Sequence, residues 1–290
     1  MDLVLRGLTW RFALVYIDDI VVYAHSHAEL QERLAEVFQR LLAANLKLKP
    51  TKVRLFQREI KFLGHLVSGQ GIVMDQSKVT DITEWPAPLN MHETRTFLGL
   101  CGYYRKFVKN YAALAAPLHE LTRIDTPFVW DERRQIAFDT LKRNLVSAPI
   151  LAMSQDEGIF VLDVDASDFA MGAVLQQEQG DALRVIGYSS RVFNSCEKKY
   201  CITRKELAAV IFGLKQYRQY LLGRHFLICS DHAALTYLRS AKELVGQQAR
   251  WLDFIEEFSF DIQHRAGTAH SNADAPLQKI LIRHSLYASM

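Results

Sequence analysis

The stretch from residue 159 to residue 177, IFVLDVDASDFAMGAVLQQ, carries acidic side chains on an otherwise apolar strand. Side chains alternate between the two faces of a strand, so Asp163 and Asp165 share one face, opposite Leu162 and Val164. Burying an unpaired carboxylate costs several kcal/mol, which means that acid at this place needs a metal ion, a basic partner or solvent. The pattern predicts a strand, a turn and a returning strand. Taken by itself, a strand end in water explains the acid.

Three further acids stand at the ends of predicted elements, and each has a simple structural explanation. Glu206 opens a helix, where it forms a T-x-x-E capping box with Thr203. Asp231 ends an apolar strand and could cap the helix that follows, and Asp274 could be an acid in the first turn of a helix. Together, however, acids at two strand ends and in the first turns of two helices can meet at one edge of a sheet.

The blocks that contain these acids resemble those of a known family. The matching blocks are Asp165-Ala166-Ser167 with the GAVL run at 172–175, Thr203-x-x-Glu206, Ser230-Asp231-His232 and the HSNAD run at 270–274. Over nearly its whole length the chain resembles the C-terminal half of the reverse transcriptase of gypsy-type LTR retrotransposons (Metaviridae), followed by its RNase H domain. The resemblance implies that Asp165, Glu206, Asp231 and Asp274 are catalytic and hold two Mg²⁺ (or Mn²⁺) ions.

The order of predicted elements in the C-terminal half agrees with this resemblance. After the opening pair of strands we expect a third strand at 182–191, a long helix at 203–222, a fourth strand ending at Asp231, short helices and a strand at 258–265. The predicted fold class is therefore α/β (α+β), with a five-stranded mixed sheet flanked by helices. Asp165 is expected in the middle of that sheet.

Residues 12–24, FALVYIDDIVVYA, read as a hairpin with Asp18 and Asp19 at its tip. Paired aspartates in a turn are commonly solvated, but here they resemble the YxDD box of reverse transcriptases, which binds catalytic magnesium. In that family a further aspartate lies well upstream, before the start of this chain. We therefore expect an incomplete polymerase site and no polymerase activity from this chain alone, with another subunit or polyprotein segment as a possible partner that supplies the rest of the palm.

Basic residues interleave with apolar ones after a predicted helix at 27–46. Lys49, Lys52 and Arg54 are candidates for contact with a nucleic-acid backbone, and a solvated face is the alternative. The run Lys61 to His65 resembles the FLGH hairpin that grips the primer strand in this family, with Gly64 and His65 as candidate contacts. Gly64 supplies freedom for the turn.

A predicted helix from residue 91 to residue 111 resembles the thumb sequence FLGLxxYYRxF of these polymerases. Its basic residues, among them Arg105 and Lys106, are candidates for phosphate contact, and a solvated basic face over a buried aromatic stripe is an equal alternative. Arg250, beside Trp251, is a candidate for contact with a hybrid. The expected nucleic-acid partners are an RNA–DNA hybrid and a template–primer duplex.

Composition sets wider limits. The 290 residues suffice for two domains of ordinary size, and 49% hydrophobic and 23% charged residues are normal globular values. A net charge of +3 is weak evidence for nucleic acid. The four cysteines form no C-x-x-C pair, which suits reduced thiols, and no signal peptide or long apolar span is evident. We expect a soluble intracellular protein without a membrane partner.

We therefore predict a partial palm in residues 1–75, a thumb and connection in 76–150, an RNase H-like domain in 155–280 and a tail in 281–290. The predicted activity is two-metal hydrolysis of the RNA strand of RNA–DNA hybrids, in which one ion activates water and the other stabilises the leaving 3′-oxygen. The alternative is an inactive element remnant that at most binds nucleic acid. One departure from the family stands at Pro276, shortly after Asp274, where the family continues Ala-Leu-Ser-Arg.

Overall fold

The computed structural model describes residues 1–124, 126–230 and 246–264, and it separates into two compact units, residues 1–60 and 61–290. Each unit has buried apolar clusters of its own. The domain boundaries expected from the sequence remain a prediction, and the tail at 281–290 lies outside the described residues. No helix in the described part of the chain combines the length and hydropathy that a membrane span requires.

The first unit contains the predicted hairpin and helix. Strands β1 (Ala13–Tyr16) and β2 (Asp19–Val22) pair antiparallel. Helix α1 (His27–Ala43) follows, with Ser26 as its N-cap, and a short 3-10 helix, η1, covers Pro50–Lys52. The apolar face of α1 closes a small core against the hairpin, which confirms the helical spacing seen in the sequence. The core residues are Leu5, Leu8, Phe12, Ala13, Val37 and Leu41.

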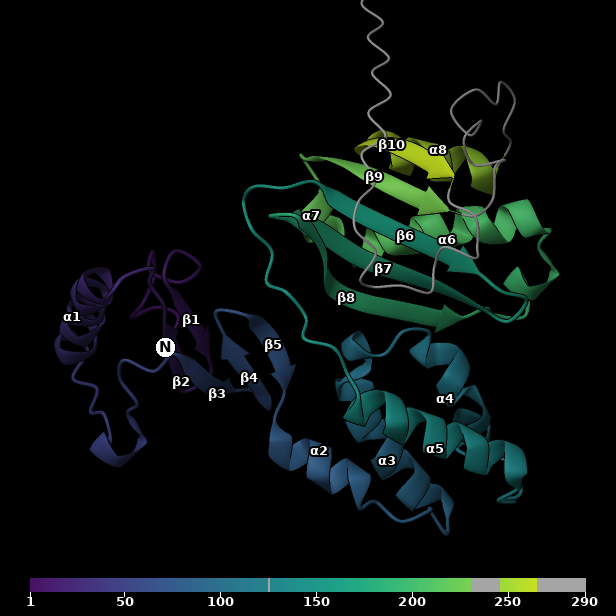
Figure 1. Ribbon diagram of the computed structural model, residues 1–290, viewed down its shortest axis with the longest axis horizontal. Coiled ribbons are helices and arrows are strands. Elements are labelled where there is room, and N and C mark those ends of the chain that lie inside the picture. The colour runs from purple at the N-terminus through teal and green to yellow at the C-terminus, as the bar shows by residue number, and fades with distance from the viewer. Residues whose placement is uncertain (125, 231–245, 265–290) are drawn as a thin grey trace, which may run out of the picture. The chain divides into compact units, whose positions relative to one another are not determined.

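The second unit opens with a three-stranded sheet and a group of helices (Figure 1). Their bounds are β3 (Glu59–Phe62), β4 (His65–Ser68), β5 (Gly71–Met74), α2 (Gln76–Thr83), α3 (Met91–Tyr103), η2 (Arg105–Phe107), α4 (Tyr111–Glu120) and α5 (Glu132–Val146). The single helix expected over 91–111 was wrong, since α3 ends at Tyr103. It ends there because the rings of Tyr103 and Tyr104 turn toward the β3–β4 hairpin, and their hydroxyls bond backbone carbonyls of its turn.

A five-stranded mixed sheet forms the rest of this unit, as the sequence predicted. Its strands are β6 (Phe160–Ala166), β7 (Ala170–Gln179), β8 (Ala182–Val192), β9 (His225–Ser230) and β10 (Ser259–His264), in the order β10-β9-β6-β7-β8. Strand β6 is central, antiparallel to β7 and parallel to β9. Side chains alternate as expected along β6, where Leu162 and Val164 are buried and Asp165 is exposed.

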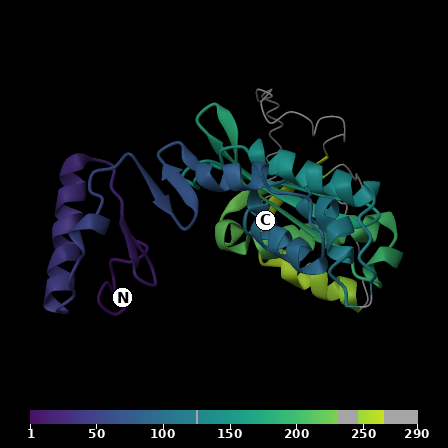
Figure 2. The ribbon, with the colours of Figure 1, turned by 90° about the horizontal axis from the view of Figure 1, so that it is seen from below.

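Helix α6 (Ile202–Gln216) lies along one face of this sheet, with α7 (Arg218–Leu221) and α8 (Gln247–Glu256) beside it (Figures 1 and 2). The close approach depends on Gly213, where an added Cβ would come within 3.2 Å of Leu162 and Ala173. The sequence predicted one helix over 203–222, and this was wrong. The helix breaks at Tyr217, whose hydroxyl donates a 2.7 Å hydrogen bond to the carbonyl of Gly187.

The helical part and the large sheet are joined by direct contacts within the second unit. Leu151 exchanges backbone hydrogen bonds with Ile72, and the amide of Ala152 donates to the carbonyl of Val185 at 2.7 Å. Near the start of α4, the amide of Ala112 donates to Ser190 Oγ on β8 at 2.8 Å. These bonds hold the N-terminal end of α4 against β8.

Candidate active site

Asp165 occupies the carboxyl end of the central strand β6. Its backbone pairs with that of Gly172 on β7, and its side chain is exposed. The strand before it is buried on the face that α6 covers, because Leu162 and Val164 are 0% and 1% exposed. The core therefore fixes the backbone of Asp165, while its carboxylate remains open to solvent.

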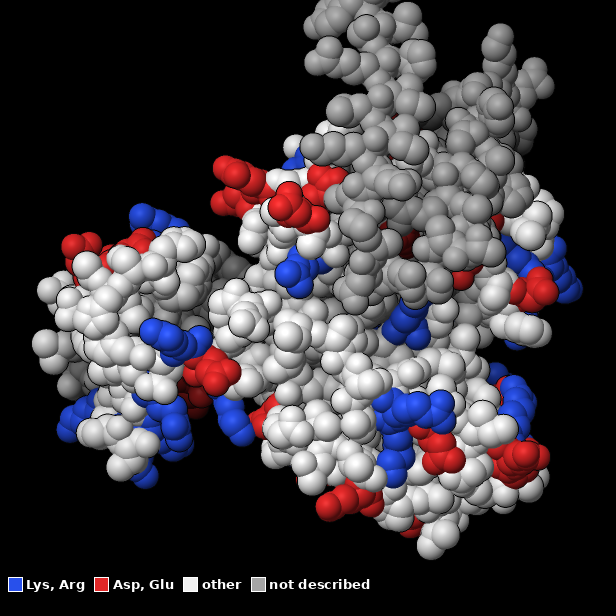
Figure 3. Space-filling model, in the orientation of Figure 1, with Lys and Arg blue, Asp and Glu red and all other residues white. Residues whose placement is uncertain are grey.

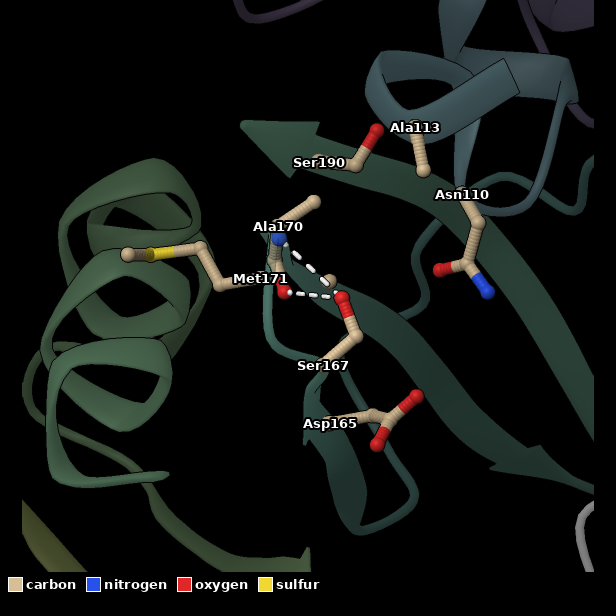
Figure 4. Close-up of a pocket in the computed structure, with 8 residues that line it drawn as sticks. Asn110, Ala113, Asp165, Ser167, Ala170, Met171 and Ser190 are labelled. Carbon is tan, nitrogen blue, oxygen red and sulfur yellow. Dashed lines mark hydrogen bonds between the residues drawn. The ribbon is translucent and has the colours of Figure 1, made fainter. Parts of the chain in front are cut away.

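The turn that follows Asp165 is closed by Ser167. Its hydroxyl donates to the carbonyl of Ala170 at 3.0 Å and accepts from the backbone amide of Ala170 at 3.0 Å (Figure 4). It also accepts from the backbone amide of Phe169 at 3.3 Å. A hydroxyl bonded in this way substitutes for backbone pairing in a tight turn. The bonds account for serine in the Asp-Ala-Ser block of the sequence, since they fix the chain directly after the carboxylate.

Glu206 lies in the second turn of α6 and is buried, with 3% of its surface exposed. The capping box with Thr203 is not formed, because α6 begins at Ile202 with Cys201 as an N-cap that makes no side-chain hydrogen bond. The structural explanation weighed for Glu206 is therefore wrong. Proteins seldom bury a carboxylate, because an unpaired one costs free energy, and buried acids are frequently functional.

An ion pair links the elements that carry these two acids. Lys205 Nζ lies 2.8 Å from Asp168 Oδ1, so the start of α6 is tied to the turn after Asp165. Lys205 is 7% exposed, and the hydrogen bond from its ammonium group lowers the pKa of the Asp168 carboxyl. The sequence analysis missed this pair. Its signal was the basic residue directly before the predicted acid Glu206.

A small pocket of about 130 Å³ opens beside Asp165. Its polar lining residues are Asp165 and Ser167 from β6 and its turn, Ser190 from β8, and Asn110 from the residue before α4 (Figure 4). The remaining lining residues are Ala113, Ala170, Met171 and Gly172. No motif in the sequence indicates Asn110 as a site residue, because residues 110 and 165 come together through the packing of α4 on β8.

The other two predicted metal ligands, Asp231 and Asp274, lie outside the described residues. Within residues 1–124, 126–230 and 246–264, no group of three or more His, Cys, Asp and Glu side chains is placed to share a metal ion. Two of the four predicted acids are therefore described. Carboxylate oxygen is the donor that Mg²⁺ prefers, so the chemistry of the acids present suits this ion.

The predicted polymerase acids lie at the tip of the hairpin in the first unit. Asp18 and Asp19 are exposed, and Ile17 before them has a positive φ of 53°, which closes the turn tightly. Their exposure fits both interpretations that the sequence left open, a solvated turn and a metal-binding box. The basic candidates of this unit, Lys49, Lys52 and Arg54, are also exposed, around the short helix η1.

In the second unit, the candidate hairpin residues Gly64 and His65 meet an aromatic cluster. The His65 ring stacks on Tyr103 at 5.5 Å between centroids and meets Tyr104 and Phe107 edge-on. Burial, followed by the charge of Lys106, lowers the pKa of His65 to about 4. The low pKa favours the neutral ring at physiological pH, and the ring contacts make His65 part of the aromatic cluster. Its contact with nucleic acid stays a prediction.

The remaining basic candidates differ in exposure. Arg105 and Arg250 are exposed. Lys106 is half-buried, with its ammonium group 5.3 Å from the centre of the Phe107 ring, and desolvation lowers its pKa. On the face that Figure 3 displays, Lys and Arg are interspersed with Asp and Glu. This mixture agrees with the small net charge of +3.

Two protein families match the sequence. Residues 1–67 match the family described as reverse transcriptase (RNA-dependent DNA polymerase), and residues 155–258 match the RNase H-like domain found in reverse transcriptase. The first match contains the Asp18-Asp19 hairpin, and the second contains Asp165 and Glu206.

Two solved structures of foamy viral protease-reverse transcriptase have a similar fold. One, in complex with double-stranded DNA, has a TM-score of 0.78 and 23% identity, and the match covers 91% of this chain and 47% of that chain. The other, in complex with an RNA/DNA hybrid, has a TM-score of 0.76 and 21% identity over 99% of this chain and 39% of that one. At these identities the similarity confirms the fold.

Curated relatives extend along most of the sequence. The retrovirus-related Pol polyprotein from transposon 297 of Drosophila melanogaster is 41% identical over 280 residues, 95% of this chain and 26% of the relative. The transposon Tf2-3 polyprotein of Schizosaccharomyces pombe is 34% identical over 265 residues, 90% of this chain and 20% of the relative. The chain thus spans about a quarter of the length of these relatives. The chain is therefore similar along most of its length to Pol polyproteins of retrotransposons, and it contains a segment that matches the reverse transcriptase family, followed by one that matches the RNase H-like domain of reverse transcriptases.

Proposed function

We propose that the C-terminal domain hydrolyses the RNA strand of RNA–DNA hybrids, at a site where Asp165, Glu206, Asp231 and Asp274 hold two divalent ions. One observation carries the proposal most strongly. Asp165 presents an exposed carboxylate at the end of the central strand, and the Lys205–Asp168 ion pair ties the turn after it to the helix turn that bears Glu206.

The direction of the strands supports the third ligand. Strand β9 runs parallel to β6, with Cys229 opposite Asp163, and its last described residue is Ser230, which directly precedes Asp231. Parallel neighbours end at the same edge of a sheet. Several carboxylates at one edge repel one another unless cations neutralise them, and paired Mg²⁺ ions supply an activated water and stabilise the leaving oxygen.

The substrate class follows from the relatives and from the pocket. The foamy viral protein of similar fold was solved with an RNA/DNA hybrid, and the matched family is an RNase H-like domain of reverse transcriptases. Beside Asp165 the pocket offers neutral polar groups from Asn110, Ser167 and Ser190, and none of the described residues that line it is a lysine or an arginine. Groups of this kind suit the sugars and 2′-hydroxyls by which proteins distinguish RNA from DNA.

Asp18 and Asp19 are the acids that would bind metal ions in a polymerase site. Nucleotidyl transfer by two metal ions needs carboxylates from more than one strand. In the described part of the first unit these two acids belong to a two-stranded hairpin without a third acid placed to share an ion. We therefore expect primer extension only when another subunit or polyprotein segment supplies the further ligand.

Cleavage of a 5′-labelled RNA strand paired with DNA, in magnesium buffer, tests the proposal. Wild type should cut the hybrid but not a DNA duplex, and Asp165→Asn and Glu206→Gln should each abolish the cutting. Asp156→Asn is the matched control, because this exposed acid precedes β6, at the end opposite Asp165. If wild type does not cut, or if Asp165→Asn cuts equally well, the chain is an inactive remnant that at most binds nucleic acid.

A further inference from the structure

Asn110 is held in an unusual backbone conformation beside the candidate active site. Its φ of 56° and ψ of 28° lie in the left-handed region, which asparagine tolerates better than most residues. Hydrogen bonds in the segment that follows Asn110 hold this conformation. The amides of Ala113 and Leu114 bond the carbonyl of Asn110, and the amide of Ala112 bonds Ser190 Oγ on β8. The backbone of Asn110, and with it the position of its Cβ, is therefore set by the fold.

That side chain points toward the pocket that Asp165 lines (Figure 4). Gly172, the cross-strand partner of Asp165, lies between them, and an added Cβ there would come 2.8 Å from Asn110 Oδ1. Glycine at this position leaves room for the amide to approach β7 next to the acid. A chain of direct neighbours thus joins Asp165, Gly172 and Asn110, although they come from β6, β7 and the start of α4.

The polar groups of the pocket differ in whether they already make hydrogen bonds within the protein. Ser167 Oγ is engaged in its own turn, and Ser190 Oγ accepts from the amide of Ala112. Within the described part of the chain, the Asn110 amide makes no hydrogen bond and caps no helix. A primary amide both donates and accepts, so it is well matched to a hydroxyl group.

We propose that Asn110 is a specificity-determining residue, whose amide binds the 2′-hydroxyl of a ribose in the RNA strand next to the bond cut at Asp165. This inference rests on the proposed function. The small side chains around the pocket, Ala113, Ala170 and Gly172, leave space for a ligand group such as a sugar beside Asp165. The helical part of the chain thereby contributes directly to recognition by the RNase H-like domain.

Asn110→Gly removes the side-chain amide without straining the backbone, because glycine adopts a positive φ freely. Asn45→Gly is the matched control, since Asn45 and Asn110 are the asparagines with positive φ in the described residues. Gly172→Ala is a second variant. It keeps the Asn110 amide group but pushes it away from its present position. The obstructing atom is at the end of a side chain, so β7 should keep its register.

The first readout is single-turnover cleavage of hybrids in which each ribose near the cut is replaced in turn by deoxyribose. Wild type should lose about tenfold in rate at one position, the order of one hydrogen bond to substrate. Asn110→Gly should be about tenfold slower on the all-RNA strand and should lose nothing further at that position. Asn45→Gly should behave as wild type.

The second readout is fluorescence anisotropy without divalent ions, which does not depend on catalysis. Wild type should bind the hybrid more tightly than a DNA duplex of the same sequence, and Asn110→Gly and Gly172→Ala should reduce that preference. An unchanged deoxyribose scan and unchanged preference in Asn110→Gly would overturn the inference while Asp165-dependent cleavage stands. If wild type neither cleaves nor prefers the hybrid, both the inference and the proposed function fail.

Discussion

The hydroxyl of Tyr104 donates a 2.8 Å hydrogen bond to the backbone carbonyl of Gly64, and Tyr103 bonds the carbonyl of Leu63 at 2.5 Å. Leu63 and Gly64 have φ values of 48° and 70°, the signs that a tight two-residue hairpin turn requires. Two neighbouring tyrosines at the end of α3 thus fasten the turn of the β3–β4 hairpin. The sequence blocks FLGH and YYRKF, about forty residues apart, act as one structural unit.

Tyr104→Phe should lower the free energy of unfolding by about 1 kcal/mol, because it removes a hydrogen bond from a carbonyl that the side chain covers. Tyr104 is 2% exposed and Tyr103 is 53% exposed, so Tyr103→Phe should cost less. Denaturant unfolding measures both values.

The same contact gives a double-mutant test. Gly64→Ala places a Cβ 2.9 Å from the Tyr104 hydroxyl at a positive φ and should cost about 1–2 kcal/mol. In the Tyr104→Phe background the cost should be smaller. The control is Gly69→Ala, where an added Cβ meets nothing within 4 Å. If the two losses in the free energy of unfolding are additive, the Tyr104 hydroxyl does not clash with the Cβ added at residue 64.

Gly213→Ala should destabilise the RNase H-like domain by about 1–3 kcal/mol through overpacking, since its Cβ would lie 3.2 Å from Leu162 and Ala173 in the core. Gly99→Ala, in α3, has open space around the new methyl group and should stabilise by about 0.5–1 kcal/mol. Thermal unfolding distinguishes the two. Equal behaviour of both variants would contradict the close packing of α6 on β6 and β7.

The His65 cluster predicts a pH dependence of stability. Burial lowers the pKa of His65 from 6.5 to about 4, and the charge of Lys106 acts in the same direction. The unfolded chain therefore takes up a proton at a higher pH than the folded protein does. The stability due to neutral His65 is complete above pH 6.5 and is lost as the pH falls from 6.5 toward 4.

A comparison with His65→Phe, which keeps an aromatic ring in the cluster, isolates this residue. Between pH 7 and pH 4.5, the melting temperature of wild type should fall more than that of the variant, by about 2–4 °C for each kcal/mol lost. An equal fall in melting temperature in the two proteins would mean that folding does not lower the pKa of His65.

The Lys205–Asp168 ion pair predicts an effect on metal binding. Lys205→Met keeps an apolar stem but releases the turn that follows Asp165, so the acids should be held less accurately. We expect about a tenfold higher Mg²⁺ requirement for hybrid cleavage, with a smaller effect on the maximal rate. Lys198→Met, in the short 3-10 helix η3 (Glu197–Lys199), serves as the control. A rate loss that saturating Mg²⁺ does not restore would assign Lys205 a different role.

Local patterns predicted most of the fold. The alternation in β6 placed Asp165 on an exposed face, and the apolar spacing of α1 gave a helix close to the one observed. The helix ends at Tyr103 and Tyr217 could not be predicted, since each is set by a hydroxyl that bonds a carbonyl distant in sequence.

The same distinction applies to the site. Asp165 and Glu206 carry motifs that a sequence displays directly. Asn110 has no such motif, because its role depends on a left-handed backbone, on glycine at position 172 and on the packing of α4 against β8. Residues whose importance arises from tertiary contact leave no periodic or spacing signal in the chain.

Crystals of the protein soaked in Mn²⁺ and examined by anomalous scattering test the central claim most directly. Two peaks about 3.5–4 Å apart, bounded by Asp165, Glu206, Asp231 and Asp274, are predicted. In Asp165→Asn crystals at least one of these peaks should disappear. Absence of any ion between Asp165 and Glu206 in the wild-type crystals would contradict the account.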